Sequence, residues 1–244
     1  MKRERTGIKP ADIGVLIVVV AAFLPFFLFP EVYEAYRRLN AEHGYLMSFV
    51  KFAILATFGE SIGLRIRTGR YIQPGFGLLP RAIVWGFLGI SIKIAFVIFA
   101  EGAPYMLKTL GVHFPMEDPA DILREPGFSW LKLVTAFTTS VTMNLFFGPL
   151  FMIAHRITDM HIVSTGGTLK GFFTPVRVRY QLQHLDWISM WGFVICITIP
   201  LWWIPAHTVN FMFPEEWRIL VAALYGIILG TILSVASLMA ERRG

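Results

Sequence analysis

Cysteine and charge are both scarce in this 244-residue chain. A single cysteine, Cys196, excludes an intrachain disulfide and any cysteine-rich metal site. Only 16% of the residues are charged, whereas 55% are hydrophobic, and so few charges would leave large apolar patches on a soluble globule of this length. Because a lipid bilayer would cover such a surface, the composition favours an integral membrane protein.

Recognisable catalytic motifs are also missing. The chain has no glycine-rich phosphate loop, no Walker pattern and no G-x-S-x-G element. His155, Asp159 and His161 come nearest to a set of metal ligands, but their H-x3-D-x-H spacing lacks the single-face arrangement that makes H-E-x-x-H a strong zinc motif. We therefore expect no enzyme, no catalytic residue, no metal and no cofactor.

Long apolar runs are what the sequence has instead. They cover residues 12–29, 46–64, 82–100, 130–153, 187–204 and 220–239. Each is close to the ~20 residues that cross a bilayer as a helix, and a lipid environment requires every backbone polar group to be hydrogen-bonded internally. The sequence thus predicts an all-α, polytopic helical integral membrane protein with six transmembrane helices.

Lysine and arginine alternate between the segments that flank these runs. The basic segments carry Lys2, Arg3, Arg5 and Lys9, then Arg65, Arg67, Arg70 and Arg81, then Arg156, Lys170, Arg177 and Arg179, and finally Arg242 and Arg243. The alternation predicts that both termini are cytoplasmic. Because the basic residues gather at the ends of apolar runs, we read the sequence pI of about 9.6 as contact with anionic lipids at the cytoplasmic face and not with nucleic acid.

The chain leaves no room for a second folded unit. We expect one membrane domain, 1–244, in which residues 1–45 form an extra N-terminal helix and loop and residues 46–244 form the core. The basic start could suggest a signal peptide, but no small-residue cleavage site follows the first run, which favours a retained helix.

Two ionisable residues, Glu60 and Lys93, interrupt the second and third runs. A charge in the middle of a bilayer costs roughly 2.5–3.5 kcal/mol or more. In one interpretation both side chains face a hydrated pathway between neighbouring helices. In the other, Glu60 pairs with a cytoplasmic arginine (Arg65, Arg67 or Arg81) and Lys93 extends to the interface or meets a backbone carbonyl. Small residues near both positions predict that the second and third helices pack closely.

The fourth run has a polar face. It contains Thr135, Thr138, Thr139, Ser140, Thr142 and Asn144. These side chains either line a cavity or bond to carbonyls one turn earlier in their own helix. Gly148 and Pro149 predict a kink. In the cytoplasmic segment that follows, residues 174–186 predict a short interfacial helix beginning at Thr174 and Pro175.

The region after the fifth run resembles a known family. Its W-W-I-P-A-H-T-V-N-F-M-F-P-E-E-W-R stretch, followed by Leu-Ser, supplies Trp203, Pro205, Asn210, Phe211, Pro214 and Arg218. This pattern is similar to the signature of the Mpv-seventeen and peroxisomal membrane protein family, although Pro205 is one place late and His207 stands where glutamine is usual. Upstream, Gly59 and Glu60 resemble the family's Gly-Asp pair.

The resemblance implies a small organelle-membrane protein that forms a weakly selective pore for small solutes, in a mitochondrial inner or peroxisomal membrane. The regular charge alternation and the lack of a transit peptide favour a prokaryotic plasma membrane. His207 and Asn210 are expected either at a pore mouth or in a structural turn that Arg218 closes.

We therefore expect a pore or carrier for small hydrophilic solutes, with a homo-oligomer as one possible state. The candidate solute-path residues are Glu60, Lys93, Asn144, His207 and Asn210. One alternative is a membrane-embedded enzyme that acts on a lipid or quinone-like substrate and uses the intramembrane carboxylate with His155 or His207 as an acid–base pair. A second is a membrane scaffold or assembly factor that docks a partner on residues 174–186.

Overall fold

A computed structural model describes residues 7–243, with side chains described up to residue 239. Within these residues the chain is helical and has no strand. Lys2, Arg3 and Arg5, which contribute to the predicted orientation, lie outside the described residues, as do the side chains of Arg242 and Arg243.

Each apolar run forms a helix. Five spans are long and apolar enough to cross a membrane: α1 (Pro10–Leu28), α3 (Gly44–Thr68), α4 (Leu78–Thr109), the continuous Trp187–Met212 segment and α11 (Glu215–Arg243). The Trp187–Met212 segment consists of α9 (Trp187–Ser189), the π-helix η3 (Met190–Trp203) and α10 (Ile204–Met212). A sixth crossing results if α5 (Trp130–Phe146) and α6 (Gly148–Ser164) count as one broken span.

The predicted kink in the fourth run is confirmed. The axes of α5 and α6 differ by 47° at Phe147, directly before Gly148 and Pro149. Proline has no backbone N–H to bond into the preceding turn, so the helix restarts at this point with Pro149 in its first turn.

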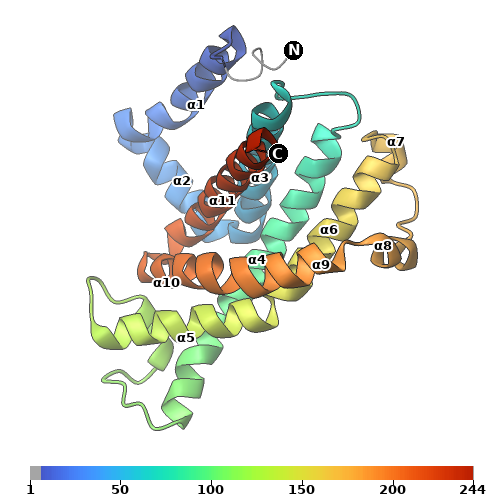
Figure 1. Ribbon diagram of the computed structural model, residues 1–244. Coiled ribbons are helices and arrows are strands. Elements are labelled where there is room, and N and C mark those ends of the chain that lie inside the picture. The colour runs from blue at the N-terminus through green and yellow to red at the C-terminus, as the bar shows by residue number, and fades with distance from the viewer. Residues whose placement is uncertain (1–6, 244) are drawn as a thin grey trace.

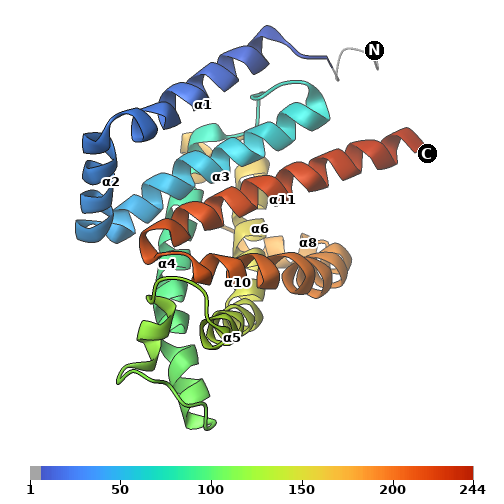
Figure 2. The same cartoon turned by 90° about the vertical axis from the view of Figure 1, so that its left-hand side faces the viewer.

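The helices form two crossing layers. Figures 1 and 2 show that α1, α3 and α11 have roughly aligned axes, while α5 and the η3–α10 segment lie side by side across them. α4 contacts both layers, packing against α3 and against α5. The helix α2 (Pro30–Glu42) connects α1 to α3 at the edge of the molecule.

Glycines set the spacing around α3. A Cβ atom at Gly89 of α4 would lie 2.6 Å from the carbonyl oxygen of Ser48, and one at Gly86 would meet the ring of Phe49 at 2.4 Å. The close approach of the second and third predicted helices is thereby confirmed. On α3 itself, however, Gly59 faces Ile227 of α11. The small residues around Glu60 therefore allow α11, and not α4, to pack closely against this part of α3.

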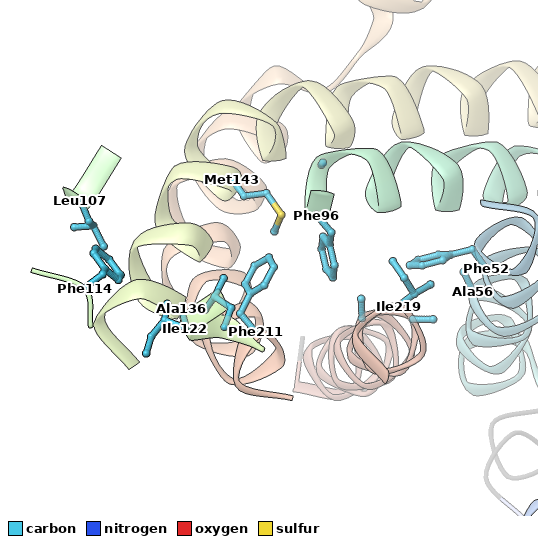
Figure 3. Packing of buried hydrophobic residues seen from close by; sticks show 14 residues of the cluster. Phe52, Ala56, Phe96, Leu107, Phe114, Ile122, Ala136, Met143, Phe211 and Ile219 are labelled. Atoms are coloured by element: carbon cyan, nitrogen blue, oxygen red, sulfur yellow. The ribbon is translucent and has the colours of Figure 1, made fainter. Parts of the chain in front are cut away.

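A continuous apolar core joins the two layers. Phe52 of α3, Phe96 of α4, Met143 of α5, Phe211 of α10 and Ile219 of α11 all belong to it. Figure 3 shows these side chains converging between the helices. Phe211 is fully buried, which gives this residue of the family-like pattern a packing role.

Two predicted helix boundaries were wrong. α4 continues nine residues past the expected end at Ala100, because Gly102 and Pro104 are accommodated inside the helix. The 3-10 helix η2 (Pro119–Leu123) then gives the following loop a buried, ordered segment. On the other side of the molecule, α7 (Leu169–Phe172) and α8 (Val178–His184) are short, and α8 begins at Val178 instead of at Thr174.

Candidate functional site

A cavity of about 710 Å³ lies between α3, α4, the α5–α6 junction, η3–α10 and α11. Its walls are largely apolar, with Phe147, Phe151, Ile199 and Leu233 among the lining residues. Ligand-binding cavities in proteins typically have volumes of about 300–1,000 Å³ and an apolar lining with a few placed polar groups. The size and lining of this cavity therefore suit a small molecule.

Glu60 lies in the cavity wall, within a network of three other helical side chains. Its carboxylate accepts hydrogen bonds from Arg81 and, over 2.8 Å, from the indole nitrogen of Trp85. His155 Nε2 lies 3.3 Å from the same carboxylate, and the imidazole stacks against Trp85 with a ring separation of 4.4 Å. Three donors satisfy most of the carboxylate's lone pairs, which is what a charge within a span requires.

Arg81 is the centre of this network. Its Nη2 atom lies 2.5 Å from Asp159 Oδ1 of α6, and its Nε atom donates to the carbonyl oxygen of Phe76 over 2.7 Å. The second oxygen of Asp159 accepts from Arg156 over 3.1 Å. The guanidinium of Arg81 thus joins the carboxylates of α3 and α6, and the network ties three helices together.

Asn144 and His207 lie deeper in the cavity wall. The amide nitrogen of Asn144 donates to the carbonyl oxygen of Ser140 over 2.8 Å and lies 3.1 Å from Nδ1 of His207. Because an amide nitrogen only donates, Nδ1 accepts and a neutral imidazole carries its proton on Nε2. Trp203 stacks on this imidazole with a ring separation of 5.3 Å.

Three of the five predicted solute-path residues, Glu60, Asn144 and His207, line this cavity, whereas Lys93 and Asn210 do not. Lys93 forms an ion pair with Glu215. The interpretation in which Lys93 and Glu60 face one pathway assumed that their helices have nearly parallel axes. Because α4 crosses α3 and extends beyond it, Lys93 lies beside Gly44, the first residue of α3, and not near Glu60.

Asn210 belongs to a turn between α10 and α11. Its amide nitrogen donates to the carbonyl oxygen of Arg218 over 2.9 Å. The guanidinium of Arg218 in turn donates to the carbonyl oxygens of Phe213 and Leu123, at 3.0 and 2.8 Å. These contacts match the structural alternative for Asn210 and Arg218. Pro214 directly precedes α11, and Pro205 lies in the first turn of α10.

The polar face of the fourth run does not line the cavity apart from Asn144. The hydroxyls of Thr135, Thr138, Thr139 and Thr142 bond to carbonyls four residues earlier. Ser140 bonds across to the carbonyl oxygen of Ile204 over 2.7 Å. The interpretation as a hydroxyl-lined cavity was wrong, and back-bonding with one interhelical contact accounts for these residues.

Sequence reasoning assigned no site role to Trp85, considered Asp159 only as a weak metal ligand, and considered His155 as a weak metal ligand and as an acid–base residue in the enzyme alternative. The missed signal was helical spacing: His155 and Asp159 are four residues apart, and so are Arg81 and Trp85, so each pair shares one helix face. His161 falls on another face and contacts the carbonyl oxygen of Phe172 at 3.1 Å. Within the described residues no group of three His, Cys, Asp or Glu side chains has the geometry of a metal site.

The fold and the site define an all-helical protein with five or six apolar spans, compatible with an integral membrane protein, and with a charged network inside its main cavity. No protein-family model, no curated protein and no solved structure matches the chain.

Proposed function

We propose that this protein is a membrane carrier for small solutes, with six spans and both termini on the cytoplasmic side, and that the solute occupies the cavity described above. The observation that carries the proposal is the convergence of Glu60, Asn144 and His207, from α3, α5 and α10, on one cavity of about 710 Å³. Polar groups brought from three distant segments into one apolar cavity within the spans favour binding of a solute over simple packing.

The form of the cavity supports a carrier more than an open pore. In the proposed orientation, residues 73–76 and Arg81 border its cytoplasmic end. At the other end the lining residues Phe52, Phe96 and Met143 also belong to the continuous apolar core. A closed core on one side of the binding site is the arrangement expected of one state in alternating access.

Two irregular elements border the cavity and give the helices a place to move. The 47° bend between α5 and α6 lies at Phe147 and Gly148, and the π-helix η3 contributes Thr198 and Ile199 to the wall. Helix breaks and π-helical segments are common at functional hinges. We propose that α6 and η3 shift relative to α3 during transport, with the Glu60–Arg81–Asp159 network changing partners.

The test is solute release from proteoliposomes that contain the purified protein. Glu60→Gln should change the rate of release severalfold, because it removes a charge in the cavity wall while keeping the side-chain shape. Lys93→Met is the matched control: it removes a charge on a neighbouring span that lies outside the cavity, and should leave release within twofold of the native rate. Both variants must first elute as monodisperse species on size exclusion.

Vesicles that retain every solute under pH and voltage steps would overturn the proposal. Equal effects of Glu60→Gln and Lys93→Met would also count against a path through this cavity. In the proposal the chain is a divergent relative of the Mpv-seventeen and peroxisomal membrane protein family in a prokaryotic plasma membrane, and the resemblance around Trp203, Phe211 and Arg218 supports it.

One observation favours a second candidate, a membrane-embedded enzyme that acts on a lipid or quinone-like substrate. Glu60 and His155, 3.3 Å apart, form a carboxylate–imidazole pair in an apolar cavity. Such pairs can serve as general acid and base. A lipid or quinone found chemically altered after incubation with the native protein, and unaltered with His155→Phe, would favour this candidate.

A further inference from the structure

Within the part of the chain that the structure describes, the charges of the cavity wall do not all have charged partners. Its two lining carboxylates there are Glu60 and Asp159, and they are neutralised by Arg81 together with Arg156. Arg67, in the last turn of α3, also lines the cavity. Among the described residues its guanidinium has no carboxylate within 4 Å, and it donates only to the hydroxyl of Ser234, over 3.0 Å. Counted over the described side chains, one positive charge at the cavity therefore has no acidic partner.

The neighbour of Arg67 on the same turn is already engaged. Arg65 donates to both carboxylate oxygens of Asp12, at 2.8 and 2.6 Å, so α1 neutralises it. Arg70 is exposed, as Arg67 is, but unlike Arg67 it does not line the cavity. Of the three arginines in this cytoplasmic segment, Arg67 alone combines a place in the cavity wall with the absence of an acidic partner among the described residues.

The lining of the cavity that Arg67 shares is largely apolar. Leu229, Gly230 and Leu233 of α11 lie along one side of the cavity, and Phe151 and Val163 of α6 also line it. A fully hydrophilic solute would lose its hydration in such a cavity without gaining enough hydrogen bonds. A guanidinium binds carboxylate, sulfonate and phosphate groups well, because its planar donors match paired oxygens.

From these charges and their partners we infer that the cavity binds small organic anions with one negative head group and an apolar body. Arg67 binds the head group, and the apolar body lies against α6 and α11. The inference rests on the proposed carrier function and narrows the solutes to one chemical class. Arg67 then acts as a specificity-determining residue. The two carboxylates of the Glu60–Arg81–Asp159 network are neutralised by Arg81 together with Arg156, so they add no net repulsion of an anion.

The test compares three probes in vesicles of phosphatidylcholine. Benzenesulfonate has a permanent negative charge and an apolar ring, phenyltrimethylammonium has a similar ring with a positive charge, and methanesulfonate has the anionic group without the ring. None of them crosses a bilayer as a neutral species. The native protein should release benzenesulfonate at least about 10-fold faster than either comparison probe, a ratio equivalent to about 1.4 kcal/mol.

Variants assign the preference to Arg67. Arg67→Gln keeps a hydrogen-bond donor for Ser234 but removes the charge, and should reduce the preference for benzenesulfonate about 10-fold. Arg67→Lys should retain most of it. Arg70→Gln, which removes a charge from the same segment outside the cavity, should release all three probes as the native protein does.

The outcomes separate the two proposals. If the native protein releases none of the probes and no other solute, the carrier function itself fails. If it releases all three at similar rates, or if Arg67→Gln leaves the preference unchanged, the carrier function stands and the inference about anions is overturned. An unchanged preference in Arg67→Gln would mean that Arg67 contacts anionic lipid head groups instead of the solute.

Discussion

Lys93 and Glu215 form an ion pair, 2.9 Å between Nζ and Oε1, that joins the middle of α4 to the first residue of α11. The carboxylate is half exposed, so the pair stabilises the fold modestly. A double-mutant cycle with Lys93→Met and Glu215→Gln should give a coupling energy of about 0.5–1 kcal/mol. Thermal unfolding in detergent measures it. If the two residues show no coupling and Lys93→Met alters solute release, Lys93 contributes to the transport path after all.

Arg81 should be far more important for stability. Arg81→Met leaves the carboxylates of Glu60 and Asp159 facing each other in a buried setting without their shared cation. Removing one partner of a buried ion network typically costs about 3–5 kcal/mol.

The matched control is Arg156→Gln, which removes the exposed partner of Asp159 and should cost less than about 1 kcal/mol. Denaturant titration of both proteins in the same detergent measures the difference. Similar costs for the two changes would mean that the network is not the junction of α3, α4 and α6 described above.

Gly89 should tolerate no side chain. Gly89→Ala places a methyl group 2.6 Å from the backbone carbonyl oxygen of Ser48, which cannot move without displacing α3. We expect a loss of about 1–3 kcal/mol.

Gly102→Ala tests the opposite case on the same helix. A Cβ atom there meets nothing within 4 Å, so the change should be neutral or stabilising by up to about 1 kcal/mol. Equal melting temperatures for the two variants would contradict the close contact of α3 and α4.

Filling the cavity should slow transport without unfolding the protein. Gly226 and Gly230 of α11 line the cavity, and a Cβ atom at either position has no neighbour within 4 Å. Gly226→Leu and Gly230→Leu should therefore reduce solute release severalfold while the melting temperature stays close to native. Gly14→Leu, on the exposed face of α1, adds the same side chain away from the cavity and should leave release unchanged.

The helices of this protein are readable from its sequence because each apolar run is long, and the kink at Gly148 and Pro149 follows from proline chemistry alone. It was harder to predict which helices and side chains contact each other. The rise of about 1.5 Å per residue holds for each helix separately, but it brings the side chains of Lys93 and Glu60 within reach of each other only if the axes of α3 and α4 are nearly parallel. Their crossing angle depends on which glycines face which helix, and the sequence around Gly59 does not indicate that its neighbour is α11.

The cavity network illustrates a similar limit. A carboxylate within a span requires donors, and Arg81 was among the arginines that the sequence offered to Glu60. His155 and Asp159 were considered as weak metal ligands, and His155 also as an acid–base residue in the enzyme alternative, but the sequence does not indicate which helix will face α3. Their spacing of four residues gives them a shared helix face, and only the packing of α6 against α4 brings that face to Glu60.

Arg65 and Arg67 lie on the same turn of α3, and α1 binds the first of them through Asp12. Asp12 holds Arg65, Lys9 reaches the carbonyl oxygen of Gly69, and no side chain along the remainder of α1 is buried. Asp12, which binds Arg65, is thus the main residue that attaches the N-terminal helix. Loss of Asp12 would remove the carboxylate that neutralises Arg65, two residues from Arg67, and with it the ion pair that attaches α1 to α3. The first helix thus sets how much positive charge remains at this end of α3.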